Sequence, residues 1–304
     1  MPREKFGKGH DFLPKNEILT YEEIRNFVKA CKPLGLRKVR ITGGEPLLRQ
    51  DLHHLVRQLS AMEMEVALTT NGSLLENNAA NLAQSGLSRV TISLDAIDQE
   101  VHSKITDSKV PVIDILDGIS AATRYELGPV KVNCVVQRGV NEHQIPKLVR
   151  KFRGTGVIVR FIEFMDVGST NGWTQGQVVP TSEIIDFLSS EFDLTPLARK
   201  SASDVAARWA HSDGSGEIGF ISSVSQPFCG DCVRARLSSD GKFFTCLFTT
   251  IGHDMSALIR SGGNTEGLTL SIEEVWSARK DRYSEERTSD AISLPRVEMS
   301  YIGG

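Results

Sequence analysis

Five segments rich in β-branched residues recur along the first half of the chain, and a stretch with helical character separates each from the next. This alternation of strands and helices predicts βαβ units, in which successive strands run parallel. The early segments begin roughly 25 residues apart, a spacing typical of a barrel or of a doubly wound sheet. The sequence therefore predicts an α/β fold with parallel strands at residues 38–42, 65–70, 89–95, 130–136 and 157–163.

Polar residues and glycines gather directly after these predicted strands. In parallel α/β folds the carboxyl ends of the strands meet at one edge of the sheet and form the active-site face. We therefore expect one pocket at this edge, lined by the residues that end the strands: Gly43, Gly44, Glu45, Thr69, Thr70, Asn71, Ser93, Asp95, Asn133, Glu163 and Met165.

The strand–helix rhythm changes near residue 170. The later part is expected to hold shorter elements: strands at 217–224, 234–238 and 242–247, and helices at 181–192, 254–260 and 271–282. Ser271 and Glu274 form a capping-box pattern that predicts the start of the last helix. We interpret residues 1–170 as the core and residues 171–304 as a region that packs against its pocket, not as an independent domain.

The composition excludes several classes of protein. A net charge of −3 argues against a general nucleic-acid binder. No apolar run approaches the roughly 20 residues of a membrane helix, and the first residues lack the apolar core of a signal peptide. The five cysteines are an odd number in a chain too large to need disulfides, so we expect a reducing, cytoplasmic location.

Three of these cysteines, Cys229, Cys232 and Cys246, have the spacing of a metal site. One interpretation is a structural zinc site with His253 as a candidate fourth ligand. Another is a [4Fe-4S] cluster held by three thiolates, which leaves one iron open to a small molecule. A third is that all three are simply buried thiols. Cys31 and Cys134 fall in core patterns and are expected to be small buried hydrophobes.

Two further motifs favour an anionic ligand without requiring one. Arg234 and Arg236 stand two apart in a predicted strand, so they project from the same face and can hold a phosphate; the alternative is a solvated basic strand. Gly43 and Gly44 let a ligand approach the backbone, and Pro46 fixes the exit of the turn. The alternative there is an ordinary strand-to-helix turn.

Taken in order along the chain, the motifs resemble those of the GTP 3′,8-cyclase family of molybdenum cofactor biosynthesis, within the radical S-adenosylmethionine superfamily. The resemblance extends from Met1 to Gly304. It is carried by I-T-G-G-E-P-L at 41–47, T-T-N-G at 69–72, S-L-D at 93–95, V-K-V-N at 130–133, R-F-I-E-F-M at 160–165, F-C-G-D-C-V-R-A-R at 228–236 and S-Y-I-G-G at 300–304.

The resemblance implies a partial (β/α)6 barrel closed by a C-terminal cluster-binding region. It also implies a reaction, the conversion of GTP to (8S)-3′,8-cyclo-7,8-dihydroguanosine 5′-triphosphate. In the family a first [4Fe-4S] cluster reduces S-adenosylmethionine to a radical, which takes the C3′ hydrogen of the ribose. The sugar carbon then attacks C8 of the guanine.

The resemblance also implies roles for individual residues. Contacts to S-adenosylmethionine are implied for Gly44, Ser93 and Met165. Contacts to GTP are implied for Arg40, Thr69, Lys131, Arg234, Ala235 and Arg236. Cys229, Cys232 and Cys246 would hold a second, substrate-facing [4Fe-4S] cluster, and the tail at Gly303 and Gly304 would reach into the active site. A triphosphate requires several cations, which these strands supply, although solvation at strand edges would also explain Arg40 and Lys131.

The sequence departs from the family at its start. The family holds its first cluster with C-x3-C-x2-C followed by Met-Pro, whereas this sequence begins at Met1 and Pro2. We count five strands where the family's barrel has six, so the first strand is expected to be absent. A late start codon, a trimmed sequence and true loss all remain open, and the reading frame upstream of Met1 would distinguish them.

Two functions are therefore carried forward. The first is the cyclase, with one [4Fe-4S] cluster expected in these 304 residues and no cleavage of S-adenosylmethionine by the chain as given. The second is a non-catalytic nucleotide-binding module with one metal site. The resemblance further implies a homodimer, and a downstream cyclic pyranopterin monophosphate synthase that consumes the product.

Overall fold

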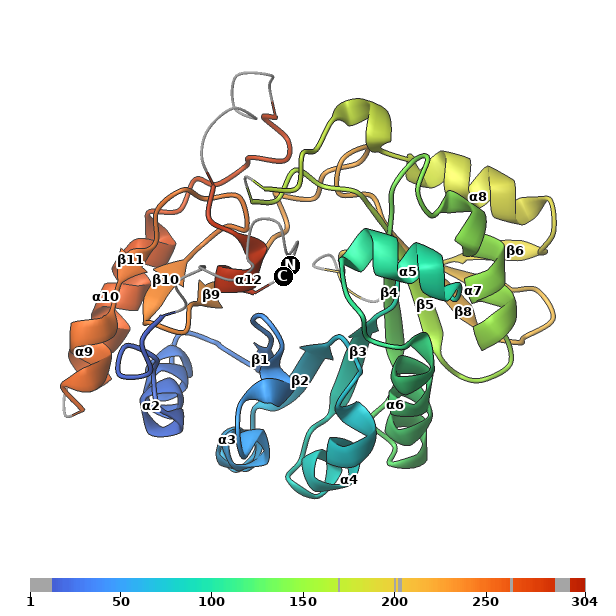
Figure 1. Ribbon diagram of the computed structural model, residues 1–304. Coiled ribbons are helices and arrows are strands. Elements are labelled where there is room, and N and C mark those ends of the chain that lie inside the picture. The colour runs from blue at the N-terminus through green and yellow to red at the C-terminus, as the bar shows by residue number, and fades with distance from the viewer. Residues whose placement is uncertain are drawn as a thin grey trace.

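The computed structural model describes residues 13–168, 170–199, 201, 204–262, 265–287 and 296–303 (Figure 1). A curved eight-stranded sheet forms its centre. In spatial order the strands are β1 (Lys38–Ile41), β2 (Glu65–Thr70), β3 (Arg89–Ser93), β4 (Lys131–Val136), β5 (Ile158–Glu163), β8 (Glu217–Ile221), β7 (Ala207–His211) and β6 (Leu194–Leu197). The strands from β1 to β8 pair in parallel, and β7 and β6 continue the sheet antiparallel.

The five predicted strands are all present, which confirms the α/β fold with a mostly parallel sheet and its partial-barrel character. A sixth parallel strand, β8, was not included in the count from sequence. It joins the sheet beside β5 because its side chains are apolar: Phe220 is fully buried, and its ring lies 6.1 Å from that of Phe161. The sheet thus continues past residue 170, and the domain boundary placed there stays a prediction.

Helices cover the outer, convex side of the sheet, as Figure 1 shows for α3, α4, α6 and α7. The α-helices are α2 (Tyr21–Cys31), α3 (Leu52–Ser60), α4 (Leu75–Gln84), α5 (Gln99–Thr106), α6 (Val112–Arg124), α7 (Ile145–Phe152), α8 (Thr181–Ser189), α9 (Ser256–Arg260), α10 (Thr265–Ser277) and α12 (Met299–Ile302). Short 3-10 helices are η1 (Pro46–Leu48), η2 (Glu142–Gln144) and η3 (Gln175–Gln177). None of the helices in the described part of the chain is long and apolar enough to cross a membrane.

A capping box begins α2, whereas the capping-box pattern at Ser271 does not begin a helix. At α2, Thr20 Oγ1 accepts from the amide of Glu23 at 3.2 Å, and the Glu23 carboxylate accepts from the amide of Thr20 at 2.7 Å. The start predicted at Ser271 is wrong, because α10 begins at Thr265 and Ser271 lies inside it. The burial of Leu268 against α2 and α9 stabilises the helical residues that precede Ser271.

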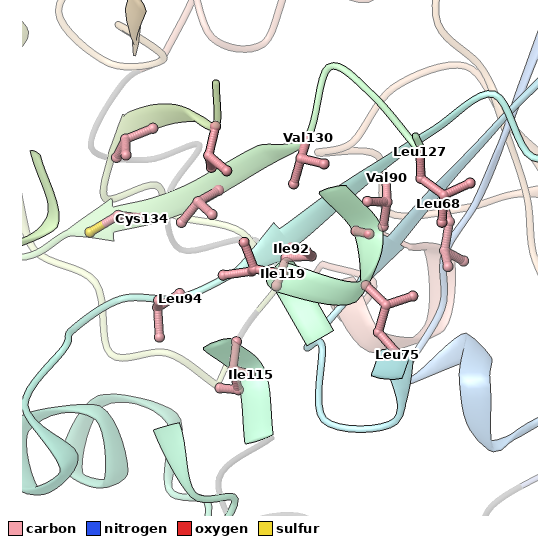
Figure 2. Packing of buried hydrophobic residues seen from close by; sticks show 14 of the residues in the cluster. Leu68, Leu75, Val90, Ile92, Leu94, Ile115, Ile119, Leu127, Val130 and Cys134 are labelled. Atoms are coloured by element: carbon pink, nitrogen blue, oxygen red, sulfur yellow. The ribbon is translucent and has the colours of Figure 1, made fainter. Parts of the chain in front are cut away.

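The main core lies between the sheet and its outer helices. Figure 2 shows Ile115 and Ile119 of α6 reaching toward Ile92 of β3, with Leu75 of α4 beside them. Each of these side chains is almost completely buried. Burial of such aliphatic side chains contributes about 1.5–3 kcal/mol each, so this layer supplies much of the stability of the barrel.

A smaller C-terminal unit packs against α2, at the end of the barrel opposite β6. Its sheet is formed by β9 (Arg236–Leu237), β10 (Lys242–Phe244) and β11 (His253–Asp254), so the strand predicted at 234–238 is shorter than expected. The unit docks on α2, where the rings of Phe27 and Phe243 lie 5.8 Å apart and the amide of Leu19 donates to the carbonyl of Ser239 at 2.7 Å. Residues after 170 thus contact both ends of the parallel sheet, through β8 and through α2.

Gly118 of α6 gives a test of the packing between α4 and α6. A Cβ at this position would lie 2.5 Å from the carbonyl oxygen of Gly72 and 3.1 Å from Cβ of Leu75. We expect Gly118→Ala to lower the free energy of unfolding by up to about 2 kcal/mol, because overpacking costs about 1–3 kcal/mol and alanine returns about 1 kcal/mol of helix propensity. Urea denaturation checks this. The control Gly176→Ala meets no atom within 4 Å, and an equal loss there would contradict the explanation.

Candidate functional site

The concave face of the sheet, on the side away from the outer helices, is polar. Side chains along a strand alternate between its two faces. In β4, Val132, Cys134 and Val136 are fully buried under the helices, whereas Lys131 and Asn133 are half-buried on the concave face. The same alternation in the neighbouring strands gathers polar side chains in the hollow of the barrel.

Two of the predicted GTP contacts touch directly in this hollow. Arg40 Nη1 donates to Thr69 Oγ1 at 2.9 Å and to Thr91 Oγ1 at 3.2 Å. Thr91 is in turn the neighbour of Lys131 across β3 and β4. Arg40, Thr69 and Lys131, predicted from three separate strands, are therefore brought together through Thr91.

Lys131 is not at the carboxyl end of its strand, because it is the first residue of β4. The register explains why it still joins the group: Thr69 pairs with Thr91, and Thr91 pairs with Lys131, so β4 is displaced along the barrel relative to β2. Such a stagger accompanies the tilt of strands in a barrel and cannot be read from one strand alone.

A further cation, Arg160 of β5, reaches the same hollow. Its Nε donates to Asn133 Oδ1 at 2.9 Å. Gly219 of β8 leaves the space for the arginine stem, since a Cβ there would lie 2.8 Å from Arg160 Cγ. The glycine in the adjacent strand thus leaves room for Arg160 to lie beside Lys131.

The cations in the hollow repel one another. Burial, followed by the repulsion of Arg160, Arg89 and Arg40, lowers the pKa of Lys131 to about 8. Burial, followed by repulsion from Arg40 and Arg89, lowers the pKa of Arg160 to about 10. The pKa of Arg40 is also lowered, mainly by burial. Solvent still reaches part of this side chain, although protein atoms surround it on most sides. A site with these properties favours a ligand with several negative charges.

A single glutamate balances part of this charge at the start of the strands. Glu65 forms ion pairs with Arg89 and, at 3.4 Å, with Lys38. Among the described residues no ion pair is formed by Arg40, Lys131 or Arg160, so the positive charge farther along the hollow is not neutralised by the protein.

The three predicted contacts to S-adenosylmethionine lie at the carboxyl ends of strands. Gly44 follows β1, Ser93 ends β3 and Met165 follows β5. The turn at Gly44 is held by Glu45, whose carboxylate accepts from Thr70 Oγ1 at 2.7 Å, from the amide of Asn71 at 2.7 Å and from the amide of Leu47 at 3.0 Å. No atom lies within 4 Å of a Cβ built on Gly44, so its backbone is open to a ligand.

The cysteine region, residues 228–248, belongs to the C-terminal unit, whose inner elements β9 and α12 lie toward the concave side of the sheet in Figure 1. Arg236 lies in the electrostatic field of both Cys232 and Cys246, and Cys246 lies in that of Cys229, so the three thiols share one neighbourhood. His253 is exposed in β11. In the part of the chain that the structure describes, no group of three or more His, Cys, Asp or Glu side chains is arranged to hold a single metal ion.

The surroundings of Cys232 favour a thiolate, whereas burial raises the pKa of Cys246. Arg234 Nε donates to Cys232 Sγ at 3.3 Å, and the amide of Phe248 donates to Cys246 Sγ at 3.5 Å. Burial opposes ionisation of Cys232, but the charge and hydrogen bonds of Arg234 outweigh it and lower its pKa. Thiolates supported by N–H donors are the ligands and surroundings that iron–sulfur clusters use.

Arg234 and Arg236 have different environments, and only Arg236 lies in β9. Arg234 and Ala235 are exposed, with the guanidinium of Arg234 over the ring of Phe228 at 5.2 Å. Arg236 is half-buried, and burial followed by repulsion from Arg234 lowers its pKa to about 10. The prediction that both arginines project from one strand face is therefore wrong, because the strand begins only at Arg236 and Arg234 precedes it.

The C-terminal tail lies between the cysteine region and the glycine turn. Ile302 is buried, and Tyr301 Oη donates to Asp240 at 2.5 Å. The carbonyl of Gly303 accepts from Arg236 Nε at 3.1 Å, while a Cβ on Gly303 would lie 2.3 Å from Thr42 Cγ2. The prediction of a docked tail is thus confirmed through Gly303, and Gly304 lies outside the described residues.

Sequence reasoning placed Asn133 in the pocket but passed over its partner Arg160, and it gave no role to Asp166. The signal for Arg160 was present, since it is a charged residue at an alternate position of an otherwise apolar strand. Asp166 gave no such signal, because its partners lie more than 100 residues away.

Comparisons with known proteins agree with this geometry. Residues 6–152 match the Radical SAM superfamily, and residues 157–285 match Molybdenum Cofactor Synthesis C. GTP 3′,8-cyclases from Acidothermus cellulolyticus and Staphylococcus epidermidis are each 44% identical to this chain, over 100% of it and 91% of their own length. The chain belongs to the GTP 3′,8-cyclase family.

Other relatives extend the same result. The GTP 3′,8-cyclase of Xanthomonas campestris pv. campestris is 45% identical over 96% of this chain and 86% of its own length. Membership of the radical S-adenosylmethionine superfamily implies a [4Fe-4S] cluster and S-adenosylmethionine as cofactors.

A solved structure supports the fold. Streptococcus suis SuiB bound to S-adenosylmethionine matches with a TM-score of 0.56 and 14% identity, over 91% of this chain and 65% of SuiB. At this identity the match shows a shared radical S-adenosylmethionine fold. The GTP 3′,8-cyclase family and the partial barrel therefore rest on independent comparisons.

The lowered pKa of Lys131 gives a test of the cationic hollow. Lys131 loses its charge as the pH rises through about 8, so we expect affinity for inorganic tripolyphosphate to fall about tenfold more between pH 7 and 9 in the unsubstituted chain than in Lys131→Met. Calorimetric titration at several pH values measures this difference. The exposed Lys104→Met serves as the control and should behave as the unsubstituted chain. Equal pH dependence in Lys131→Met would contradict the assignment.

Proposed function

We propose that this chain acts on GTP in the cyclisation that gives (8S)-3′,8-cyclo-7,8-dihydroguanosine 5′-triphosphate, the first step of molybdenum cofactor biosynthesis. The observation that carries the proposal is 44% identity to GTP 3′,8-cyclases over the whole chain. A hollow with unbalanced positive charge, facing three clustered thiols, is the arrangement that such a substrate requires.

The triphosphate would lie in the cationic hollow. Arg40, Lys131 and Arg160 come from three strands and have no carboxylate partner among the described residues. In the free protein they repel one another, and a bound polyanion would remove that repulsion while accepting charge-assisted hydrogen bonds. Thr69 keeps Arg40 oriented, so its proposed role is to position a phosphate ligand.

The guanine would lie toward the cysteine region. Cys229, Cys232 and Cys246 would hold a [4Fe-4S] cluster there, and three thiolates leave one iron for a substrate atom. Arg236 would connect the two ends of the site, because it lies beside the thiols and donates to the carbonyl of Gly303. Arg234 and Ala235 are exposed at the same rim and are proposed as outer contacts of GTP.

S-adenosylmethionine would bind at the carboxyl ends of the strands. The open backbone of Gly44 follows β1, the exposed Ser93 ends β3 and the half-buried Met165 follows β5, which supports this assignment. Reductive cleavage of S-adenosylmethionine supplies the radical that removes a hydrogen from the substrate. The residues of this chain would orient the two ligands and exclude water. Gly303 lies between the two sides, and we propose that the tail helps to align them.

The family relationship supports three further proposals. We propose one [4Fe-4S] cluster bound by the cysteines of this chain, a reducing cytoplasmic location for those thiolates and a homodimeric assembly. The product would be passed to a cyclic pyranopterin monophosphate synthase.

Iron analysis tests the cysteine assignment. After anaerobic reconstitution we expect about four irons per chain, and the Cys246→Ser variant should retain fewer than about one, because it loses one of three thiolate ligands. Cys31→Ala is the control, since burial in α2 raises the pKa of the Cys31 thiol to about 12 and keeps it protonated, so the iron content of this variant should not change. One zinc and no iron in the unsubstituted chain would refute the cluster.

Electron paramagnetic resonance tests the position of GTP. GTP should change the signal of the reduced cluster, because the base is proposed to reach the open iron. Inorganic tripolyphosphate should occupy the cationic hollow without changing that signal. The Arg236→Gln variant should weaken GTP binding about tenfold through loss of a charged hydrogen-bond donor. An identical signal with and without saturating GTP would refute the proposed orientation.

A further inference from the structure

β5 leads into four residues that the C-terminal half of the chain contacts one after another. We call residues 163–166, Glu163-Phe164-Met165-Asp166, the β5 strip. The carbonyl of Phe164 accepts from Trp173 Nε1 at 2.8 Å, and the carbonyl of Met165 accepts from Asn171 Nδ2 at 2.9 Å. The outer two residues of the strip are buried carboxylates.

Glu163 binds two segments that are distant in sequence. One carboxylate oxygen accepts from the amide of Thr181, at the start of α8, at 2.8 Å and also from Ser225 Oγ. The other accepts from the amides of Val224 and Ser225, each at 2.8 Å. The side chain is completely buried, and four donors fill its two oxygens. Such a carboxylate fixes the relative position of the backbone segments that donate to it.

The segment that Glu163 holds leads directly into the cysteine region. Ser225 lies four residues before Cys229 in the chain. A short connection of this kind transmits the position of its anchored end to the loop that follows. Glu163 therefore sets the place from which the first two cysteines approach the hollow.

Asp166 is connected to the third cysteine, Cys246, through intervening aromatic residues. Its carboxylate accepts from Tyr283 Oη at 2.5 Å, and it forms ion pairs with Arg296 at 2.8 Å and Arg287 at 3.0 Å. The Tyr283 ring stacks on Phe248 with centroids 4.7 Å apart.

The contact continues to the sulfur atom. Phe248 is two residues beyond Cys246, and its amide donates to Cys246 Sγ at 3.5 Å. A path of direct contacts therefore runs from Asp166 through Tyr283 and Phe248 to Cys246. Burial opposes ionisation of Asp166, but Tyr283 and the two arginines outweigh it and lower its pKa, so the carboxylate stays charged in this network.

Met165 lies between these two anchors. We propose that Glu163 and Asp166 are positioning residues, which hold Met165 and the cysteine region in one fixed geometry so that S-adenosylmethionine and the substrate meet at a constant separation. The inference rests on the proposed function, because it requires S-adenosylmethionine at Met165 and a cluster at the cysteines. It assigns catalytic alignment to two residues that touch neither ligand.

The Glu163→Gln and Asp166→Asn variants of the full chain, reconstituted with iron and sulfide, test the proposal. Glutamine keeps the size of the side chain but places an NH2 group against backbone donors, so two of the four hydrogen bonds are lost. We expect tripolyphosphate affinity to stay within about threefold of the unsubstituted chain, since the cationic hollow is intact. The GTP-dependent change in the cluster signal should fall by at least about half at saturating GTP, because the cysteine region is displaced from the base.

Glu142→Gln is the matched control. Glu142 also accepts from two backbone amides, those of Gly139 at 2.6 Å and Val140 at 3.0 Å, but both lie in its own loop. This variant should keep the full GTP-dependent signal. Ser225→Ala, which removes one hydroxyl donor and leaves both amides in place, should give an intermediate loss. It remains measurable if Glu163→Gln does not fold.

The outcomes separate the two proposals. If GTP changes the cluster signal as much in Glu163→Gln, Asp166→Asn and Ser225→Ala as in the unsubstituted chain, the positioning role is overturned and the proposed function stands. Absence of that signal in the unsubstituted chain would overturn both. A loss of thermal stability accompanied by an unchanged signal per bound GTP would identify the carboxylates as structural supports only, and would also overturn the proposal.

Discussion

Repulsion among like charges on the concave face of the sheet is the constraint on which the rest of this structure depends. Burial lowers the pKa values of Arg40, Lys131 and Arg160, and repulsion from neighbouring cations lowers them further. None of the three forms an ion pair with a described carboxylate. This arrangement disfavours the empty site, and the apolar layer between the sheet and its outer helices offsets the cost. The protein therefore keeps a binding hollow charged by placing its stabilising contacts on the other face of the same strands.

The second half of the chain joins two distant edges of the sheet. β8 extends the sheet beside β5, and the C-terminal unit docks on α2 near β1. Hydrogen bonds to the buried carboxylates of Glu163 and Asp166 fix how these parts meet. Since both carboxylates flank Met165, the packing that closes the barrel is continuous with the geometry of the site.

Much of the fold follows from local patterns. Segments rich in β-branched residues marked the five strands, and a capping box at Thr20 and Glu23 begins α2. The patterns were less reliable in the C-terminal unit, where short elements depend on their neighbours. Ser271 carried a start signal that the packing of Leu268 overrode, and the strand predicted at 234–238 shortened to two residues.

The sequence by itself determined which residues are candidates for the chemistry: the three cysteines of the C-terminal unit, the glycine turn at Gly43 and Gly44, and cations on several strands. Only the tertiary structure decided which of them meet. The stagger of β4 brings Lys131 level with Thr91, and the closing of the barrel brings Asp166 to Arg296, 130 residues later. A local pattern reports the periodicity of one element, whereas register and long-range hydrogen bonds depend on how all the elements pack together.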